Sequence, residues 1–306
     1  MTLQEKLRLI QKFRGKSQEK LAAELGVSFP TLNSWINGRS LPRKKAREKI
    51  DETFLRCTGQ NVIPSNVLEA KKQEIERLSK KYSGVLRTIL NQKDIYDQFV
   101  LSLTFHTNRI EGSTLTEPET AAILFEGAAL PDKTLTEQLE AKNHQTALHY
   151  LFHHLEGKEK VDEELVLKLH GILLNSIQHD AGRYRNHGVR ITGANVPTAN
   201  PEKVPALMKD LFVKISEKRK DVIAHAAFIH SIFEQIHPFS DGNGRIGRLL
   251  LHGMLLSRDL PPAMIRQEKR RFYILYLNQS QLQNDFSRLE DFICDSILES
   301  FEHLNR

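Results

Sequence analysis

The segment from His237 to Arg248, which reads His-Pro-Phe-Ser-Asp-Gly-Asn-Gly-Arg-Ile-Gly-Arg, holds the residues best suited to chemistry. An apolar run follows it directly, which predicts a loop that leads into the start of a buried helix. The first turn of a helix leaves backbone N–H groups unpaired and carries partial positive charge. Gly242 and Gly244 let the backbone approach a ligand closely. These features predict an anion-binding loop built mainly from main chain, to which Arg245 and Arg248 add guanidinium groups.

Two further side chains in this segment indicate what happens to a bound phosphate. Asp241 offers the oxygen ligand that Mg²⁺ takes together with phosphate oxygens. His237, with an ordinary pKa near about 6.5, is largely neutral at pH 7 and can accept a proton. Alone, the Gly-Asn-Gly turn is more typical of a plain loop and His237 of a histidine that only makes hydrogen bonds, but their joint spacing favours transfer of a phosphorus group to a hydroxyl. The Gly-Lys-Ser/Thr ending of a P-loop does not follow, so an ordinary Walker site is excluded.

The pattern His-x-Phe-x-Asp/Glu-Gly-Asn-Gly-Arg-x-x-Arg in this segment resembles the signature of Fic-domain proteins and matches it at every defined position. The resemblance implies an all-helical catalytic domain that transfers AMP from Mg·ATP to a Ser, Thr or Tyr hydroxyl of a target protein or of the chain itself. It implies that His237 is the base and that Asp241 holds Mg²⁺. By the same resemblance the nucleotide is bound by Gly242, Asn243, Gly244, Arg245, Arg248 and, in a later helix, Tyr273.

The composition is that of a soluble globular protein, with 306 residues, 40% of them hydrophobic and 27% charged. No apolar run approaches the ~18 residues of a membrane span, so we expect no membrane partner. The first residues contain no apolar signal core. Only Cys57 and Cys294 are present, which argues against a disulfide framework and predicts a cytoplasmic location.

The first part of the chain is basic. Residues 1–60 hold 13 Lys and Arg against 6 Asp and Glu, so they account for the net charge of +6, and the rest is nearly neutral. Ser17 predicts a cap for a short amphipathic helix, and Ser28 one for the next, after a turn at Gly26. This arrangement resembles a helix-turn-helix of the phage-repressor type and predicts a small domain over residues 1–58.

The same domain offers candidate DNA contacts. The second helix of such modules faces the major groove, where Phe29 and Pro30 provide no hydrogen bonds to base edges. The residues predicted to contact DNA are Ser28, Ser34, Arg39, Arg43, Lys44 and Lys45. The alternative is a solvated basic face in a module that contacts protein.

The predicted catalytic domain spans residues 95–306, after a linker and one long helix over 59–94 that runs from Ser65 to about Leu90. Glu111 ends a helix within Thr107-Asn108-Arg109-Ile110-Glu111-Gly112 and lies at the unfavourable end of the helix dipole, so it would gain from an arginine partner. The segment resembles the inhibitory helix of Fic proteins, which implies that Glu111 pairs with Arg248 and disturbs the γ-phosphate. The alternative is a surface glutamate.

Alternating residues around Gly193 predict a short β-hairpin over Val189–Pro197. It resembles the flap with which Fic proteins are thought to align a target segment by strand addition. The alternative is a packing hairpin with no role in target binding. The predicted fold is therefore all-α, with a small hairpin flap and a preceding helix-turn-helix. Two other functions stay open: removal of AMP at the same site, or a DNA-binding transcription regulator whose Fic domain senses ATP. The sequence does not decide between a monomer and a homo-oligomer.

Overall fold

The computed structural model describes residues 3–58, 65–82, 84–190 and 196–304, and these residues are helical with connecting loops. No strand occurs among them, which confirms the predicted all-α class. The predicted hairpin over Val189–Pro197 falls mainly on residues 191–195, which lie outside the described part of the chain. The chain divides into two compact units, Met1–Pro64 and Ser65–Arg306.

The first unit is a four-helix module. Its helices are α1 (Leu3–Arg14), α2 (Gln18–Leu25), α3 (Phe29–Ile36) and α4 (Lys44–Thr58). The predicted caps form: the Ser17 side chain accepts from the Lys20 amide and the Ser28 side chain from the Thr31 amide. Gly26 ends α2 in the left-handed conformation, at φ 74°, which a glycine adopts without steric cost.

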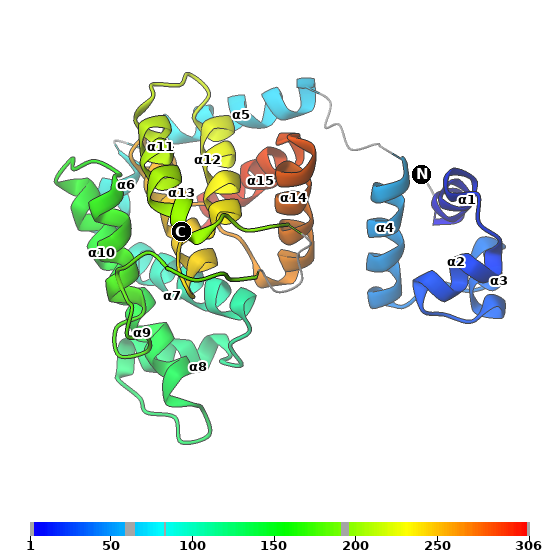
Figure 1. The fold of residues 1–306 in the computed structure, drawn as a ribbon, viewed down its shortest axis with the longest axis horizontal. Coiled ribbons are helices and arrows are strands. Elements are labelled where there is room, and N and C mark those ends of the chain that lie inside the picture. Colours follow the sequence, from blue (N-terminus) through cyan, green and yellow to red (C-terminus); the bar gives the residue numbers. More distant parts are fainter. Residues whose placement is uncertain (1–2, 59–64, 83, 191–195, 305–306) are drawn as a thin grey trace. The chain divides into compact units, whose positions relative to one another are not determined.

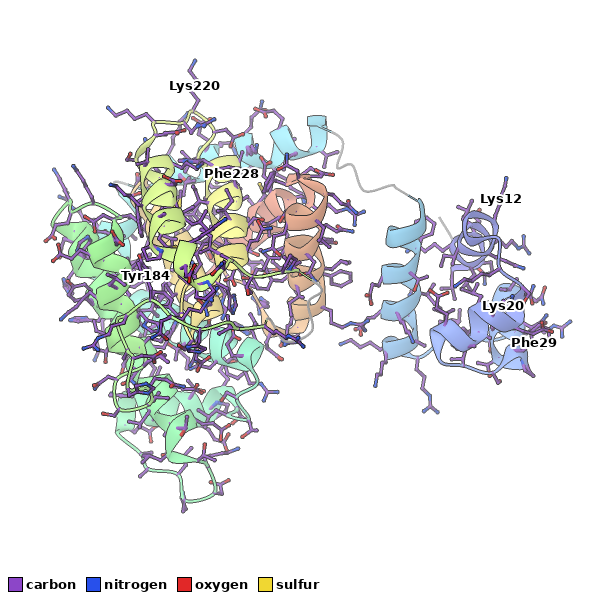
Figure 2. All side chains as sticks on the ribbon, viewed as in Figure 1. Lys12, Lys20, Phe29, Tyr184, Lys220 and Phe228 are labelled. Carbon is purple, nitrogen blue, oxygen red and sulfur yellow. The ribbon has the colours of Figure 1, made fainter. Side chains whose placement is uncertain are left out.

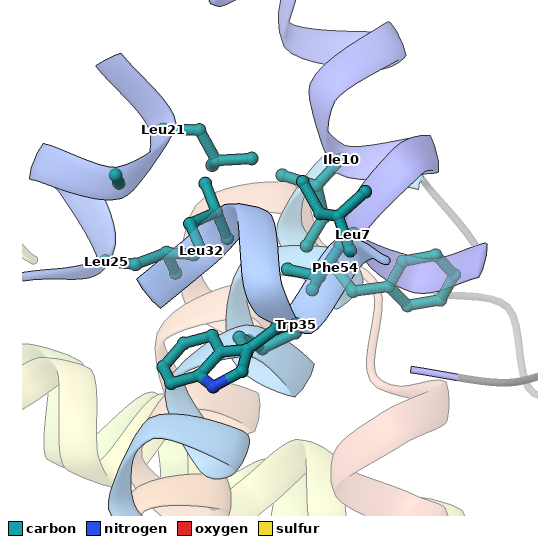
Figure 3. Packing of buried hydrophobic residues seen from close by; sticks show 10 residues of the cluster. Leu7, Ile10, Leu21, Leu25, Leu32, Trp35 and Phe54 are labelled. Carbon is teal, nitrogen blue, oxygen red and sulfur yellow. The ribbon is translucent and has the colours of Figure 1, made fainter. Parts of the chain in front are cut away.

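Apolar side chains from all four helices of this unit meet in one small core (Figure 3). Leu7 and Ile10 come from α1, and Phe54 comes from α4. The five residues predicted for this core are all buried in it: Leu21, Ala22, Leu25, Leu32 and Trp35. Burial of each large side chain contributes roughly 1.5–3 kcal/mol, so the nine large side chains of this cluster hold the short module together, with Ala22 between them.

The second unit contains the remaining helices, whose order is seen in Figure 1. Its α-helices are α5 (Ser65–Ser79), α6 (Val85–Asn91), α7 (Lys93–Glu111), α8 (Glu117–Ala121), α9 (Leu135–Glu156), α10 (Glu163–Leu173), α11 (Val204–Ser216), α12 (Val222–Ile236), α13 (Asn243–Leu256), α14 (Arg270–Gln283) and α15 (Ser287–Leu304). Short turns of other helix types lie at η1 (Ala122–Glu126), η2 (Pro201–Lys203) and η3 (Gln267–Lys269). No described helix is long and apolar enough to cross a membrane.

The single long helix predicted from Ser65 to about Leu90 is wrong, because the structure has two helices, α5 and α6, in its place. Gly84, at φ 116°, precedes α6, and the carboxylate of Asp259 accepts a hydrogen bond from the Val85 amide at 2.6 Å. A tertiary contact therefore starts a new helix where the apolar pattern alone continues.

Helix α13 lies at the centre of the second unit. It packs against α7, α9, α10 and α12, and most of its side chains are buried, including those of two arginines. Helix α12 runs directly into the loop that precedes α13, and α14 and α15 also pack on α12. Helix α13 is therefore held by helices from distant parts of the sequence.

Candidate active site

The loop from His237 to Gly242 reverses the chain between α12 and α13. His237 ends α12 in the left-handed conformation, at φ 53°, which is uncommon for a residue with a side chain. Gly242 directly precedes α13 and has φ 75°, and a Cβ at this position would also approach Leu174 to 3.1 Å. Gly242 is therefore required both by its backbone conformation and by its close packing. Strain of the kind at His237 concentrates at functional sites.

Asn243 fastens this loop from inside. Its side-chain oxygen accepts from the Phe239 amide at 2.8 Å, and its side-chain amide donates to the Phe239 carbonyl at 2.8 Å. Both polar ends of the Asn243 side chain are thus engaged, and the residue is 2% exposed. The part of Asn243 that remains for an anion is its backbone amide in the first turn of α13, where N–H groups lack helical partners.

His170 of α10 contacts this loop through a ring stack and a hydrogen bond. The ring of His170 stacks on Phe239 with centroids 3.8 Å apart. The Gly182 amide donates to Nδ1 of His170 at 2.8 Å, so the proton is on Nε2, which donates to the Asp241 carbonyl at 3.2 Å. Burial lowers the pKa of His170 to about 4, so it stays neutral and keeps this pair of bonds at neutral pH.

Arg185 holds the other end of the loop. Its guanidinium donates to the carbonyls of His237 at 2.7 Å, His187 at 2.7 Å and Ala199 at 2.6 Å. Its backbone amide donates to the Pro238 carbonyl at 3.0 Å. One buried arginine therefore fixes the backbone at His237 and ties it to the segments that flank residues 191–195.

The imidazole of His237 is oriented as a proton acceptor. Its Nδ1 lies 3.2 Å from the carbonyl oxygen of Glu234, which can only accept, so Nδ1 carries the proton and Nε2 keeps a lone pair. Burial lowers the pKa of His237, so the ring is neutral at pH 7. A neutral ring with a fixed tautomer is the form that a general base needs.

Asp241 is half exposed beside the start of α13, with 50% of its side chain accessible. One carboxylate oxygen accepts from the Gly242 amide at 2.7 Å, and the other lies 3.4 Å from the Arg245 guanidinium. Arg245 is itself buried and donates to Glu140 at 2.7 Å. It therefore reaches Asp241 and Glu140 and does not line the cavity described below.

Arg248 is buried beneath the same loop, with 3% of its side chain exposed. Its Nε donates to the Thr107 hydroxyl at 2.7 Å, and Nη2 donates to the carboxylate of Glu111. The Tyr273 ring lies 5.9 Å from the guanidinium carbon. Burial disfavours its charge, but the attraction of Glu111 outweighs this and raises the pKa of Arg248. Glu111 keeps 38% of its side chain exposed; partial desolvation disfavours its charge, but Arg248 holds the pKa of Glu111 below its usual range.

Glu111 also covers the anion-binding loop. A Cβ placed on Gly244 would lie 2.3 Å from a carboxylate oxygen of Glu111 and 3.2 Å from Nη1 of Arg248. The carboxylate therefore sits against the first turn of α13, where partial positive charge is available. The C-terminal end of helix α7 places the Glu111 carboxylate at this position. Gly112 ends α7 in the left-handed conformation, and Arg270 of α14 donates to the Ile110 carbonyl at 2.6 Å.

Glu111, His237, Arg248 and the loop residues 240–244 line a cavity of about 440 Å³. The motif loop, Glu111 and Arg248 form its polar side. Helix α14 forms the opposite wall, with Tyr273, Ile274, Leu277, Asn278 and Gln281. The anion-binding loop suits phosphates, and the mixed apolar and amide wall suits a base, so the cavity matches the polarity of a nucleotide.

The structure brings most of the predicted site residues to this cavity. Those that line it are Glu111, His237, Asp241, Gly242, Asn243, Gly244, Arg248 and Tyr273. Sequence reasoning did not find Glu140, Thr107, Arg185, His170 or Glu234, which pair with or support the motif residues. Among these, Glu234 carried a signal, since it stands three positions before His237, in the last turn of the helix that His237 ends.

The residues predicted to contact DNA lie in the first unit and are not part of this site. Ser28 caps α3, and Ser34 shares a hydrogen bond with Ser40 at 2.8 Å. Four basic residues are exposed between the end of α3 and the first turn of α4: Arg39, Arg43, Lys44 and Lys45. Phe29 also points outward, at the start of α3, with 41% exposure (Figure 2).

Residues 160–255 match the sequence profile of the Fic/DOC family, and residues 12–54 match that of the helix-turn-helix. The second unit therefore contains a Fic/DOC-family domain, and the first contains a helix-turn-helix. The chain has the Fic fold: it superposes on Fic-1 of Caenorhabditis elegans with a TM-score of 0.67 at 24% identity, over 94% of this chain and 84% of that one. A Fic-domain signaling protein of Bacteroides thetaiotaomicron gives 0.66 at 24% identity, over 77% and 98%.

Curated relatives show the same likeness in sequence. The chain is 34% identical over 193 residues to the protein adenylyltransferase Fic of Nematostella vectensis, which is 61% of this chain and 44% of that protein. It is 34% identical over 208 residues to the protein adenylyltransferase fic-1 of C. elegans, which is 66% of this chain and 39% of that protein. The chain thus spans less than half the length of these two relatives in the matched region.

Proposed function

We propose that this chain is a protein adenylyltransferase that moves AMP from ATP to a Ser, Thr or Tyr hydroxyl of a protein, and that Glu111 inhibits it. The observation that carries the proposal is the position of the Glu111 carboxylate, against Gly244 and on Arg248, in a cavity that His237 also lines. A carboxylate held there marks a site built for anions. The names of the curated relatives support the same reaction class.

The proposed reaction needs one proton acceptor and one anion-binding loop. The target hydroxyl oxygen attacks the α-phosphorus and forms the new P–O bond, while its proton passes to Nε2 of His237. The bond between the α-phosphorus and the oxygen that bridges to the β-phosphate breaks, and pyrophosphate leaves. Backbone amides at the start of α13 and the guanidinium of Arg248 stabilise the charge on the phosphates.

The residues present fit a Mg²⁺ ion. Among the described residues no group of three or more His, Cys, Asp and Glu could hold a metal ion alone. Asp241, half exposed at the edge of the cavity, supplies one carboxylate, which is what Mg²⁺ uses when phosphate oxygens and water complete its coordination. When bound, the ion neutralises phosphate charge. Arg245 holds the orientation of Asp241 through its 3.4 Å contact.

Inhibition follows from competition for one guanidinium. The buried guanidinium of Arg248 donates one terminal N–H to Glu111 and its Nε–H to Thr107. A γ-phosphate that needs the same nitrogen must displace the carboxylate. A charge-assisted hydrogen bond is worth about 1.5–3 kcal/mol, so loss of Glu111 should raise transfer by about 10- to 150-fold.

The test is self-modification in the presence of Mg·ATP, measured by mass spectrometry on intact chains. We expect Glu111→Gly to gain AMP faster than the wild type, and the double variant Glu111→Gly with His237→Ala to gain none. Glu111→Gln is the matched control for charge alone, since it keeps the size of the side chain. Equal labelling with and without His237 would refute the proposed role of the histidine.

The reverse reaction is the second candidate, because Glu111 and His237 line one cavity and a carboxylate there could orient a water molecule. Release of free AMP from a modified target protein by the wild type, and its loss in Glu111→Gly, would favour removal. Faster labelling of the same target by Glu111→Gly with no AMP release by the wild type would favour addition.

We also propose that the first unit binds DNA and that the protein acts in the cytoplasm. The exposed basic residues support DNA binding, because Lys44 and Lys45 add charge to the N-terminus of α4, which already favours an anion. The test is binding of duplex DNA by the full chain at several salt concentrations. Affinity that does not change with salt would contradict a phosphate-binding role.

A further inference from the structure

Glu234 is an acidic residue of the cavity that the proposed reaction does not use. It lies on the last turn of α12, is 7% exposed, and lines the same cavity as Glu111 and His237. Its Oε1 is buried and has no hydrogen-bond partner. A buried charged oxygen without a partner costs several kcal/mol, so the carboxyl group needs either a proton or a cation.

The carboxyl group is pressed against the helix that carries Arg248. A Cβ on Gly247 would lie only 2.2 Å from Oε1 of Glu234, so the acid packs directly on the backbone of α13 one residue before Arg248. The backbone there is itself fixed, since Nδ1 of His230 donates to the Gly247 carbonyl at 3.0 Å and Nε2 of His230 bonds to the Tyr273 hydroxyl at 2.7 Å. Glu234 therefore packs on a part of α13 whose backbone is held in place by His230.

Two carboxyl groups thus experience the charge of one guanidinium: Glu111 is hydrogen-bonded to Arg248, and Glu234 lies against the neighbouring Gly247. Among the described residues, Arg248 of α13 attracts the charged form of Glu234 and Glu111 of α7 opposes it. Tyr273 of α14, whose hydroxyl bonds to His230, lines the same cavity. Because Arg248 is already paired with Glu111, it does not offset the burial of a second negative charge.

We propose that Glu234 is a positioning residue that acts in its neutral, protonated form. While Glu234 is neutral, the positive charge of Arg248 stays available to the anion in the cavity, which is either Glu111 or a nucleotide phosphate. When Glu234 ionises, it competes for Arg248 from the α12 side, and both anions bind less well. The inference rests on the proposed function for the identity of the second anion. Burial raises the pKa of Glu234 to about 7, so both forms are populated near neutral pH.

The experiment compares two full-length proteins that differ only at Glu234. The parent carries Glu111→Gly, which removes the competing carboxylate, and His237→Ala, which stops turnover and removes the imidazole that also lines the cavity. The second protein adds Glu234→Gln, which has the shape of the neutral acid and cannot ionise. Binding of Mg·ATP is measured by calorimetry from pH 6 to pH 8. Titration of ATP itself is common to both proteins and cancels in the comparison.

Without Glu111, Arg248 is free to attract the charged form of Glu234, and a phosphate that binds Arg248 takes that attraction away, so binding takes up a proton. We expect Kd of the parent to rise with pH, by up to about tenfold between pH 6 and pH 8. The Glu234→Gln protein should keep the low-pH affinity throughout. Equal pH dependence of the two proteins would overturn the inference while leaving the nucleotide site intact. No binding of ATP by either protein would instead contradict the proposed function.

A second measurement keeps the inference testable if Glu234→Gln does not fold. Calorimetric binding of Mg·ATP to the parent alone, in buffers of different ionisation enthalpy at pH 7.5, reports the number of protons exchanged. We expect net proton uptake, because binding favours the neutral form of Glu234. Binding without proton uptake at this pH would overturn the inference.

Discussion

The two units of this protein treat their positive charges in opposite ways. In the first unit the basic residues between α3 and α4 are exposed, and the buried side chains of its core are apolar. In the second, Arg245 and Arg248 are each 3% exposed, and each has a carboxylate partner: Glu140 and Glu111. Exposed cations are screened by salt and adapt to many anions, whereas buried ones are fixed in place.

This difference shows what each unit can recognise. A flexible, hydrated lysine can follow the phosphates of a duplex, and its contribution falls as salt rises. A buried guanidinium whose Nε is bonded to Thr107 points its remaining nitrogens in one direction, so it selects an anion by geometry. The second unit therefore suits a reaction in which one phosphate must be held in register with a base.

The largest expected effect comes from replacing a buried arginine of the second unit by lysine, compared with the reverse replacement of an exposed lysine in the first unit. Arg248→Lys, made in the Glu111→Gly chain, keeps the charge but loses the planar fork, so transfer of AMP should fall by about 10- to 150-fold. Lys44→Arg is the matched exchange in the first unit and should leave DNA affinity within about twofold, because an exposed phosphate contact needs only charge. Initial rates of labelling and a DNA titration measure the two. Similar losses in both units would break the contrast.

The next effect concerns Glu234 and the pH dependence of the free energy of unfolding. Because the folded state raises the pKa of Glu234 from 4.5 to about 7, it binds a proton more tightly than the unfolded chain. Stability is therefore lost as pH rises from about 4.5 to about 7. Glu234→Gln removes that loss, so its stability relative to the wild type should increase across this window by up to about 3 kcal/mol. Urea unfolding at pH 5, 6, 7 and 8 measures it, and a constant difference would show that Glu234 does not titrate in the fold.

A smaller effect is expected where α12 and α13 touch. Gly247→Ala would bring a Cβ to 2.2 Å from Glu234 and 3.1 Å from Phe233, so the helices must shift, at a cost of about 1–3 kcal/mol. The control is Gly188→Ala, where a Cβ meets nothing within 4 Å. Thermal unfolding of the two variants gives the comparison. A Gly247→Ala protein as stable as the control would mean that the contact with Glu234 is loose.

The smallest effect belongs to the exposed lysines. Lys44→Ala with Lys45→Ala should lower DNA affinity only several-fold at physiological salt, and should reduce the slope of log affinity against log salt by about one for each lost phosphate contact. The folding of the first unit should not change, since both side chains are exposed. An unchanged salt slope would exclude these lysines from the DNA interface.

The sequence predicted the parts of the site that are contiguous in the chain. The glycine turn at Gly242, the start of α13 and the caps of α2 and α3 depend on neighbouring residues, so local rules are sufficient for them. The pairing of Glu111 with Arg248 was reached through a family resemblance. Spacing alone does not bring together two residues 137 positions apart.

What the sequence did not reveal depends on tertiary packing. Asn243 was expected to grip phosphate, yet its side chain is engaged with the Phe239 backbone. Arg245 was expected to bind phosphate and is instead buried against Glu140, more than a hundred residues earlier in the chain. Neither partner is visible in a pattern, because a hydrogen bond across the fold leaves no periodic signal. Whether these two residues bind nucleotide stays a prediction.

The most direct test of the central claim, that the first turn of α13 holds a triphosphate beside His237, is a crystal structure of the Glu111→Gly chain with magnesium and a non-hydrolysable ATP analogue. The account predicts phosphate oxygens on the backbone amides of residues 242–245, the γ-phosphate on Arg248, and Nε2 of His237 facing the α-phosphorus. An analogue bound elsewhere, or a first turn that stays without phosphate at saturating analogue, would contradict it.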